Sequence, residues 1–487
     1  MPSTEAATAA TPVKGSPQLP TRGRGWLWEL LPPVALLTLG SLLLVRGHAL
    51  WYDELFTAEV ARLPLGDIVR SIIDGEGITP YLEGVPPSYN GPYYLVMHAW
   101  MALPGIGSDT SLRILTLLAA AAGLAVLVRA VTRLAGRPAG VVAGLAIAAN
   151  PLLVPQAVQA RSYGLALLAT AVAFLGLVRW LQDSPRGLLL FGIGGAAMGL
   201  AHWYTAGVLI GFVVAAWVVR RDALPVAVVG ALAVLPTVAL VVLNLLNGNA
   251  DRNAFQDTTN GALSWYAAQA WAGQQTVLLA VTLALTAAAL VRAPRIGVIG
   301  ACWLGVPLVL LTAVETLVRP VYTPRYLLTA LLALGVLAGV GATVWSRRSL
   351  VVALSALLVG CSLVATIPLL DRPGRERGDE VVEMLAAAHR LGEPIVAGDR
   401  RSAIALDHYI RLLAPDLRPD LSLPPDDAPA GPDRVWLVRR EVDGGLTKTD
   451  DETLLRAEGL ALAGETRFSA SSTTLVVQRW DRAVQDR

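Results

Sequence analysis

Two adjacent acids, Asp53 and Glu54, stand in the stretch WYDELF, shortly after the first long apolar segment of the chain. A carboxylate held at a fixed place can take a proton from a hydroxyl group, which is the work of a general base. Acids beside apolar segments are also commonly solvated loop residues. The choice between these interpretations depends on which other polar residues share their side of the molecule.

Arginines at the ends of later apolar segments are the natural counterparts of these acids. Arg161, in QARSYG, begins one such segment, and Arg319 and Arg325 lie in ETLVRPVYTPRYLL before another. An arginine beside an apolar helix is costly unless it has an anionic partner, such as a lipid phosphate bound by charge-assisted hydrogen bonds. We favour Arg161 and Arg325 for this role. The alternatives are that Arg161 reaches ordinary lipid headgroups and that Glu315 neutralises Arg319 or Arg325.

Histidine and aromatic residues near these arginines are less specific signals. His202 and Tyr204, in AHWYTAG, suit a phosphate or a metal, but a histidine satisfied at the membrane interface is an equal alternative. Trp265 and Tyr266, in the loop 247–275, either stack on a sugar or belong to the aromatic belt found at any membrane interface.

Metal chemistry receives little support. No His, Asp or Glu spacing resembles a dedicated zinc site. Cys302 and Cys361 fall inside apolar segments, so the sequence suggests neither a disulfide framework nor a cysteine-based metal site. We expect no obligatory metal and therefore no metal-ligand residues. A divalent ion joining Asp53 or Glu54 to a phosphate stays open as the alternative.

The elements that must position these residues are membrane helices. The chain is 54% hydrophobic and only 16% charged, with a mean hydropathy of +0.55, whereas about a quarter of the residues of a soluble domain are charged. It is therefore an integral membrane protein. A net charge of +2 is too small to indicate a nucleic-acid partner.

A helix needs about 20 apolar residues to cross a bilayer, and eleven segments approach this length. They are 26–46, 111–130, 139–157, 162–181, 187–203, 205–219, 224–246, 276–292, 296–316, 326–345 and 349–370. Arginines cluster in alternate connections, as in short cytoplasmic loops. This pattern places the N-terminus in the cytoplasm and, with an odd number of spans, the C-terminus outside.

Three parts of the chain follow. Residues 1–24 are Ala, Thr and Pro-rich and are expected to be disordered and cytoplasmic. Residues 25–370 form the membrane-spanning catalytic domain, in which the first extracytoplasmic loop, 47–110, contains short helical patterns that lie along the interface. Residues 371–487 have the composition of a soluble α/β domain on the extracytoplasmic face, because short strand and helix patterns alternate there.

Five stretches, in order, resemble the GT-C glycosyltransferases of the protein-O-mannosyltransferase and aminoarabinose-transferase type, family 39. They are WYDELFTAEVA, NGPYYLVMHAW, QARSYGLALLA, AHWYTAGVL and TPRYLLTALLAL. The resemblance covers roughly residues 26–370 and implies an all-α GT-C membrane bundle of about 11 transmembrane helices and a polyprenyl-phosphate sugar as donor. Where many relatives read His-Pro-Pro, this chain has Asn90-Gly91-Pro92, so the substrate does not transfer by analogy.

The resemblance and the chemistry together give each candidate a role. Asp53 is the catalytic base, matching the first acid of the family's pair, and Glu54 orients the acceptor or influences Asp53 through like-charge proximity. The donor phosphate is expected to contact Arg161, Arg325, Arg319, His202 and Tyr204. The sugar or acceptor is expected to contact Tyr52, Asn90, Tyr93, Tyr163, Trp265, Tyr266 and Tyr322.

The favoured function is an inverting glycosyltransferase of the bacterial plasma membrane. It moves a sugar, mannose by preference, from a polyprenyl phosphate to a hydroxyl of an envelope glycan, lipid or protein. A transporter or flippase for lipid-linked sugars is the main alternative, but it would place ionisable groups near the bilayer midplane rather than at the outer helix ends. A noncatalytic scaffold would explain the soluble domain but not the placement of acids and arginines.

Overall fold

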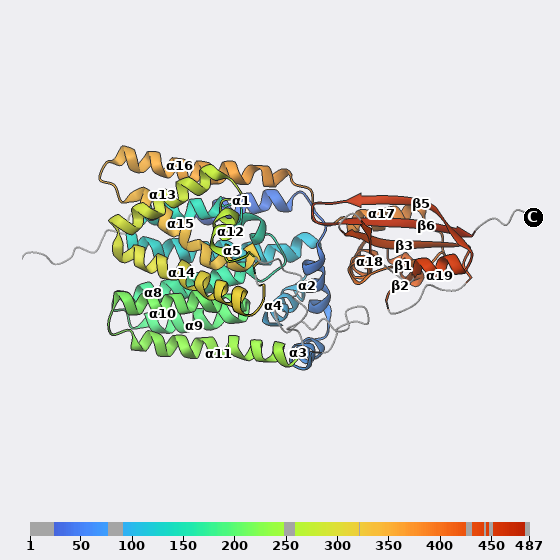
Figure 1. Cartoon of the computed structure of the whole chain (residues 1–487), viewed down its shortest axis with the longest axis horizontal. Helices are drawn as coiled ribbons and strands as arrows, with labels where there is room; N and C mark the ends of the chain where they lie inside the picture. Colours follow the sequence, from blue (N-terminus) through green and yellow to red (C-terminus); the bar gives the residue numbers. More distant parts are fainter. Residues whose placement is uncertain are drawn as a thin grey trace, which may run out of the picture.

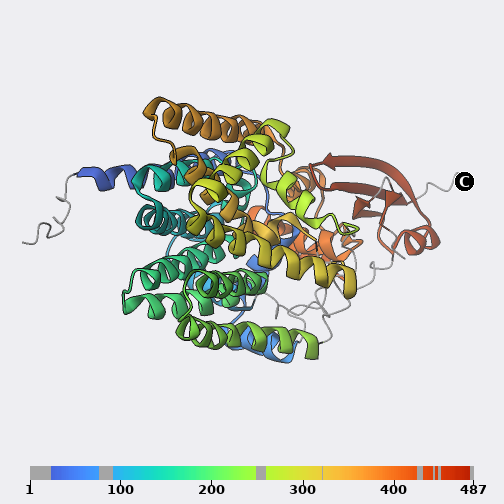
Figure 2. The ribbon, with the colours of Figure 1, turned by 60° about the vertical axis from the view of Figure 1, so that its left-hand side comes forward.

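The computed structural model describes residues 24–75, 91–247, 259–320, 322–424, 431–442, 445–447 and 451–482. A bundle of long helices occupies one part of the molecule, and a smaller domain with a β-sheet lies beyond one end of the bundle (Figure 1). The same separation is visible from a second direction (Figure 2). The chain is a multi-pass membrane protein by the length and apolar character of its helices.

Every one of the eleven predicted segments contains a helix. The bundle helices are α1 (Leu31–Leu44, continuing η1, Arg24–Leu30), α5 (Asp109–Ala135), α6 (Arg137–Ala148), α7 (Leu153–Ala157), α8 (Tyr163–Leu181), α9 (Arg186–Ala201), α10 (Ala206–Val219, after η4, Trp203–Thr205), α11 (Leu224–Leu246), α13 (Thr276–Arg292), α14 (Pro294–Leu317), α15 (Leu328–Thr343, after η6, Pro324–Leu327) and α16 (Arg348–Thr366, before η7, Ile367–Asp371). Among the described residues, seven helices are long and apolar enough to cross a membrane, or eight if a pair bent by 107° counts as one span. The remaining three segments form shorter apolar helices.

The third predicted segment, 139–157, is not one continuous helix. Pro151 has no N–H and cannot continue the hydrogen-bonding pattern of α6. The side-chain Oδ1 of Asn150 accepts hydrogen bonds from the N–H groups of Leu152 (2.9 Å) and Leu153 (3.1 Å), which starts α7 instead. The prediction of an unbroken span was wrong here because the Asn-Pro pair offers the backbone this local alternative.

Short helices cover the end of the bundle nearest the sheet domain (Figure 1). They are α2 (Tyr52–Arg62), α3 (Leu65–Asp74) and α4 (Gly91–Met101), all in the loop 47–110, where short helices were predicted. Another short helix, α12 (Leu263–Trp271), lies between α11 and α13 in the chain. The helix α12 was not predicted, because the aromatic residues of its loop suggested contacts rather than an element.

The tail domain is a mixed sheet with helices. Its elements are α17 (Gly378–Ala388), β1 (Ile395–Ala397), α18 (Arg400–Leu413), η8 (Pro415–Asp420), β2 (Leu421–Ser422), β3 (Arg434–Val442), β4 (Gly445–Leu446), α19 (Asp451–Ala457), β5 (Leu460–Ser469) and β6 (Thr474–Arg482). The strand order is β2-β1-β3-β6-β5, with β4 paired to β3. Strand β1 is parallel to β2 and β3, whereas β6 is antiparallel to β3 and β5. The predicted small α/β domain is therefore confirmed as a fold.

A polar network fixes the tail domain to the bundle. His408 Nε2 lies 3.0 Å from Asp109 Oδ1, and Tyr409 Oη donates to Asp109 Oδ2 at 2.5 Å. Arg411 Nη2 lies 3.2 Å from Glu59 Oε2. Burial alone would raise the pKa of Glu59, but the hydrogen bond from His408 and the charges of Arg62 and Arg411 outweigh it and lower the pKa to about 2. These paired groups hold α18 against α2 and the start of α5.

Candidate active site

The two acids begin helix α2 and share its positive end. Trp51 is extended and precedes the helix, and Asp53 and Glu54 lie in the first turn, where the helix dipole favours negative charge. Glu54 Oε2 accepts a hydrogen bond from the backbone N–H of Trp51 at 3.4 Å, which is one half of a capping box. The same start of the helix therefore orders both carboxylates, but they point into different surroundings.

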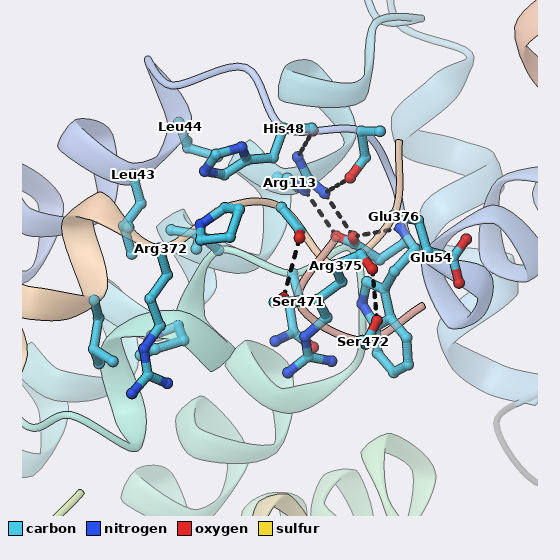
Figure 3. Close-up of a pocket in the computed structure, with 18 of the residues that line it drawn as sticks. Leu43, Leu44, His48, Glu54, Arg113, Arg372, Arg375, Glu376, Ser471 and Ser472 are labelled. Carbon is cyan, nitrogen blue, oxygen red and sulfur yellow. Dashed lines mark hydrogen bonds and ion pairs between the residues drawn. The ribbon is translucent and has the colours of Figure 1, made fainter. Parts of the chain in front are cut away.

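Glu54 is a buried structural acid. It is 0% exposed. Its Oε1 accepts from Arg113 Nε at 2.8 Å and from the backbone N–H of Ala160 at 2.7 Å, and its Oε2 accepts from Arg113 Nη2 at 2.6 Å (Figure 3). Both oxygens are therefore engaged, and Glu54 also lines the cavity described below, so its role of orienting the acceptor stays a prediction. Glu54 follows Asp53 in the chain, and Ala160 precedes Arg161. The hydrogen bond between Glu54 and Ala160 therefore links the two segments that carry Asp53 and Arg161.

Arg113 is the residue that the sequence interpretation missed. It also donates to the carbonyl oxygens of His48 (2.5 Å) and Ala49 (3.0 Å), so it joins α5 to the segment before α2. A signal for it was present, because an arginine near the start of an apolar segment is costly unless it is paired. Its place one turn into the segment 111–130 made it look like an ordinary flanking charge.

Asp53 lies between two arginines from distant parts of the chain. Its Oδ2 is 3.7 Å from Arg161 Nη2 and 3.4 Å from Arg325 Nη2. Arg161 Nη1 also donates to the backbone carbonyl of Asp53 at 3.3 Å. The Asp53 side chain is 20% exposed, whereas that of Arg161 is 4% exposed. The structure thus brings together the predicted base and the two arginines favoured for the phosphate.

Close packing of α8 on α5 sets the position of Arg161. A Cβ at Gly164 would come within 2.2 Å of the carbonyl oxygen of Thr116, so only glycine allows this approach. The Thr116 hydroxyl then donates to the carbonyl of Arg161 at 3.0 Å. The loop that carries Arg161 is therefore fixed from both the α5 side and the Glu54 side.

An aromatic cluster adjoins the arginines. His202 lies 5.8 Å from Tyr163, 5.6 Å from Tyr204 and 5.2 Å from Tyr326, measured between ring centroids. Tyr204 and Tyr326 are stacked at 4.7 Å. Arg161 and Arg325 are the charged neighbours of the His202 ring. Of the predicted phosphate ligands, His202 thus lies beside both arginines, and Tyr204 packs against His202 and Tyr326.

Three buried polar atoms near Asp53 have no hydrogen-bond partner among the described residues: Trp51 Nε1, Tyr163 Oη and Arg325 Nε. Leaving a buried donor unsatisfied costs about 1–3 kcal/mol. Three such atoms around one carboxylate indicate a place where a ligand supplies the missing partners.

A cavity of about 550 Å³ adjoins this cluster (Figure 3). One wall is apolar and comes from the bundle, with Leu43, Val158 and Leu369 among its residues. The polar lining residues come from both the bundle and the tail domain. Trp51 and Arg325 line the cavity, whereas Asp53 and Arg161 are not among its lining residues. The ion-pair cluster therefore lies beside the cavity and meets it through Trp51 and Arg325.

Three other predicted residues lie elsewhere. Tyr93 is 1% exposed and its hydroxyl lies 3.3 Å from Thr116 Oγ1, so it packs in the core. Tyr52 lies under the guanidinium of Arg401 in the tail domain, at 4.5 Å from Cζ to the ring centroid. Arg319 is a charged neighbour of Tyr204.

The remaining aromatic candidates form a separate group. Trp265 and Tyr266 on α12 are 55% and 47% exposed, and Tyr266 lies 6.0 Å from Tyr322 between ring centroids. None of the three lines the cavity. Asn90 lies outside the described residues. Within the described ranges, no group of three or more His, Cys, Asp or Glu residues is placed to hold a metal ion.

Glu376 is a second acid at the cavity, and the sequence interpretation did not single it out. It is 4% exposed. Burial raises its pKa to about 7, and Asp53 acts in the same direction, while a backbone hydrogen bond from Tyr52 and the charges of Arg401 and Arg440 oppose the shift. Near neutral pH, Glu376 is therefore poised between its acid and its carboxylate.

The titration of Glu376 predicts a pH dependence of stability. Its folded-state pKa of about 7 lies above the ordinary value of 4.5, so its stabilising contribution is complete below pH 4.5 and is lost as the pH rises through 7. The free energy of unfolding of wild type should fall between pH 5 and pH 8 as Glu376 loses its proton. In Glu376→Gln this side chain stays neutral, so the fall over the same range should be smaller by about 1–3 kcal/mol. Thermal unfolding in detergent across this range measures the difference. The exposed acid Glu383 supplies the matched control, Glu383→Gln, and equal pH slopes for Glu376→Gln and wild type would contradict the assignment.

Comparison with known proteins supports the architecture. No family model and no curated protein matches the sequence. The crystal structure of ArnT from Cupriavidus metallidurans in the apo state is similar with a TM-score of 0.55 at 16% identity, covering 93% of this chain and 97% of that chain. The same protein bound to undecaprenyl phosphate gives a TM-score of 0.56 at 16% identity and the same coverage.

A larger protein shares the fold over part of its length. The single-particle cryo-EM structure of the arabinofuranosyltransferase AftD from Mycobacteria gives a TM-score of 0.52 at 14% identity, covering 95% of this chain and 40% of that chain. ArnT and AftD are both GT-C proteins, and the similarity to them extends over the bundle and the tail domain together. The chain therefore has the GT-C fold that its motifs indicated.

Proposed function

We propose that the protein is a glycosyltransferase that takes its sugar from a polyprenyl phosphate and inverts the configuration of the anomeric carbon. The observation that carries this proposal is the Asp53 carboxylate held between Arg161 and Arg325, beside buried polar atoms that have no partner among the described residues. The fold is also that of ArnT, a protein whose structure has been determined with undecaprenyl phosphate bound.

The chemistry assigns one task to each side chain. Asp53 takes the proton of the acceptor hydroxyl as that oxygen bonds to the anomeric carbon. The bond between the anomeric carbon and the phosphate oxygen breaks, and its electron pair leaves with the polyprenyl phosphate. Arg161 and Arg325 neutralise the charge that develops on the phosphate. Attack opposite the leaving group gives inversion through an oxocarbenium-like transition state.

The position of the site supports an extracytoplasmic reaction. Helix α2, whose first turn contains Asp53, and the tail domain share one end of the bundle (Figure 1). Arginines of the opposite end form the clusters expected of cytoplasmic loops, including Arg129 and Arg137, which both pair with Glu29. We therefore propose that the N-terminus is cytoplasmic and that the tail domain faces the envelope.

A donor panel tests the function and identifies the sugar. Purified wild-type protein is incubated with radiolabelled polyprenyl-phosphate sugars and a cell-envelope fraction. Mannose is the sugar we expect, and polyprenyl-phosphate arabinose and aminoarabinose are the competing donors. Transfer from one donor into a glycan, lipid or protein fraction is the predicted result. The absence of transfer from every donor would falsify the proposed activity.

Metal removal should leave the activity unchanged. The Glu54 carboxylate is already saturated by Arg113 and Ala160, and two arginines face the phosphate, so the described residues supply the required charge themselves. We expect transfer rates with EDTA and with added Mg²⁺ to agree within about twofold. Loss of activity in EDTA that Mg²⁺ restores would instead favour the divalent ion joining Asp53 to the phosphate.

A further inference from the structure

Three arginines of the tail domain line the cavity on the side away from the bundle. Arg372 and Arg375 belong to the connector that follows η7, and Arg401 belongs to the first turn of α18. We call these three residues the tail arginine cluster. Among the described residues, none of the three guanidinium groups forms a salt bridge, whereas most other tail arginines are paired with an acid.

The connector is held in place rather than loosely attached. The turn between β5 and β6 forms hydrogen bonds with it. The N–H and the hydroxyl of Ser471 donate to the carbonyl of Gly374 at 2.9 and 3.0 Å. Ser472 donates from its N–H and hydroxyl to the carbonyl of Arg375 at 3.3 and 2.6 Å (Figure 3). Arg375 is therefore a preorganised group at the cavity wall.

Arg375 lies close to another cation. Its guanidinium Cζ is 4.4 Å from the centroid of the Trp51 ring, and the Cζ of Arg325 is 5.1 Å from the same centroid. Burial, and then the charge of Arg325, lower the pKa of Arg375. Arg325 is already paired with Asp53, whereas Arg375 forms no salt bridge among the described residues, so burying its charge beside Arg325 is costly unless an anion joins it.

The charge of the cavity exceeds what the donor needs. Five arginines and two glutamates line it. The positive charge of Arg113 is neutralised by the Glu54 carboxylate. Glu376 is only partly ionised near neutral pH. A polyprenyl-phosphate sugar is a phosphodiester with a single negative charge, and Arg161 and Arg325 already face it. The tail arginine cluster is therefore left for a second anion.

We propose that the tail arginine cluster binds a phosphate or carboxylate group of the acceptor, so that the enzyme selects acidic envelope acceptors. The identification of the ligand as an acceptor rests on the proposed function, but the existence of an anion-binding site does not. The apolar wall formed by Leu43, Val158 and Leu369 suits an acceptor that is also amphipathic. The tail domain thus completes the substrate site rather than merely covering it.

A binding experiment separates this site from the donor site. Full-length protein in nanodiscs is saturated with polyprenyl phosphate, and the binding of radiolabelled hexyl phosphate and of hexanoate is then measured by equilibrium dialysis. Hexyl glucoside serves as the neutral probe. We expect wild type to bind at least one of the two anionic probes in the presence of polyprenyl phosphate, and Arg375→Gln/Arg401→Gln to bind that probe about tenfold or more weakly. The affinity of the double variant for polyprenyl phosphate should stay within about twofold of wild type, which also shows that it is folded.

The matched control is Arg390→Gln/Arg400→Gln, which removes the same charge from exposed positions outside the cavity lining and should bind like wild type. The proposal is overturned if wild type binds neither anionic probe, if polyprenyl phosphate displaces both, or if the double variant binds them like wild type. A parallel loss of polyprenyl phosphate binding in the double variant would also overturn it, by assigning the cluster to the donor. Because binding is measured without transfer, these outcomes are distinct from a failure of the proposed activity.

Discussion

Asp53→Asn should lower kcat for sugar transfer by about 10²–10⁴-fold while leaving the protein folded. The amide has nearly the shape of the carboxylate but cannot accept the proton of the acceptor hydroxyl. Donor affinity should be unchanged or higher, because Arg161 and Arg325 would no longer share their charge with Asp53. Steady-state transfer kinetics and polyprenyl phosphate binding measure the two effects separately.

The control for this variant is Asp67→Asn. Asp67 lies on α3, also in the first outer loop, and pairs only with the exposed Arg70 among the described residues. We expect its kcat to match wild type. If Asp53→Asn retained kcat within about twofold of wild type, Asp53 would not be the base, although the donor panel would still stand on its own.

The second large effect concerns the buried pair Glu54 and Arg113. Arg113→Met should lower the free energy of unfolding by about 3–5 kcal/mol, because it leaves the Glu54 carboxylate buried without its cation. Adding Glu54→Gln should recover part of this loss, since the amide oxygen still accepts from the N–H of Ala160 and no unpaired charge remains. Thermal or denaturant unfolding in detergent gives the values.

Arg133→Met is the appropriate control, because Arg133 is exposed and its Nε donates to the neutral side chain of Gln182. Its stability should change by less than about 1 kcal/mol. The Glu54 assignment would be contradicted if Arg113→Met were as stable as this control, or if the double variant were less stable than Arg113→Met alone.

Asp53 and Glu54 are adjacent in the chain but have different surroundings in the structure. The sequence could not show this difference. Adjacent residues of a helix point in different directions, so only the fold decides that Glu54 faces Arg113 and Ala160 while Asp53 faces two arginines. Glu54 and Ala160 are each next to one partner of the Asp53–Arg161 pair. Glu54 therefore helps to fix the backbone positions of both.

What the sequence did predict follows from the cost of placing groups in a bilayer. Apolar length identified eleven helical segments, and the same physics made Arg161 and Arg325 informative, because an arginine at the outer end of a span needs an anion. Continuity inside a segment was less predictable, as the break at Pro151 shows. The positions of aromatic residues were poorly predicted, because residue type alone does not distinguish Tyr93 in the core from Tyr266 on the surface.

The tail domain shows the limit more clearly. Arg375, Glu376 and Arg401 lie in a segment whose sequence indicated only a soluble α/β domain. They line the cavity because α18 packs on α2 and the β5–β6 turn forms hydrogen bonds with the connector. These long-range contacts have no local sequence pattern. The signal available was the run of charges in DRPGRERGDE between the last span and the first tail helix.

A structure of the full-length protein with polyprenyl phosphate bound would test the central claim most directly. We predict that the phosphate lies between the guanidinium groups of Arg161 and Arg325, next to the Asp53 carboxylate. A phosphate bound away from both arginines, with the Asp53 ion pairs intact, would contradict the account.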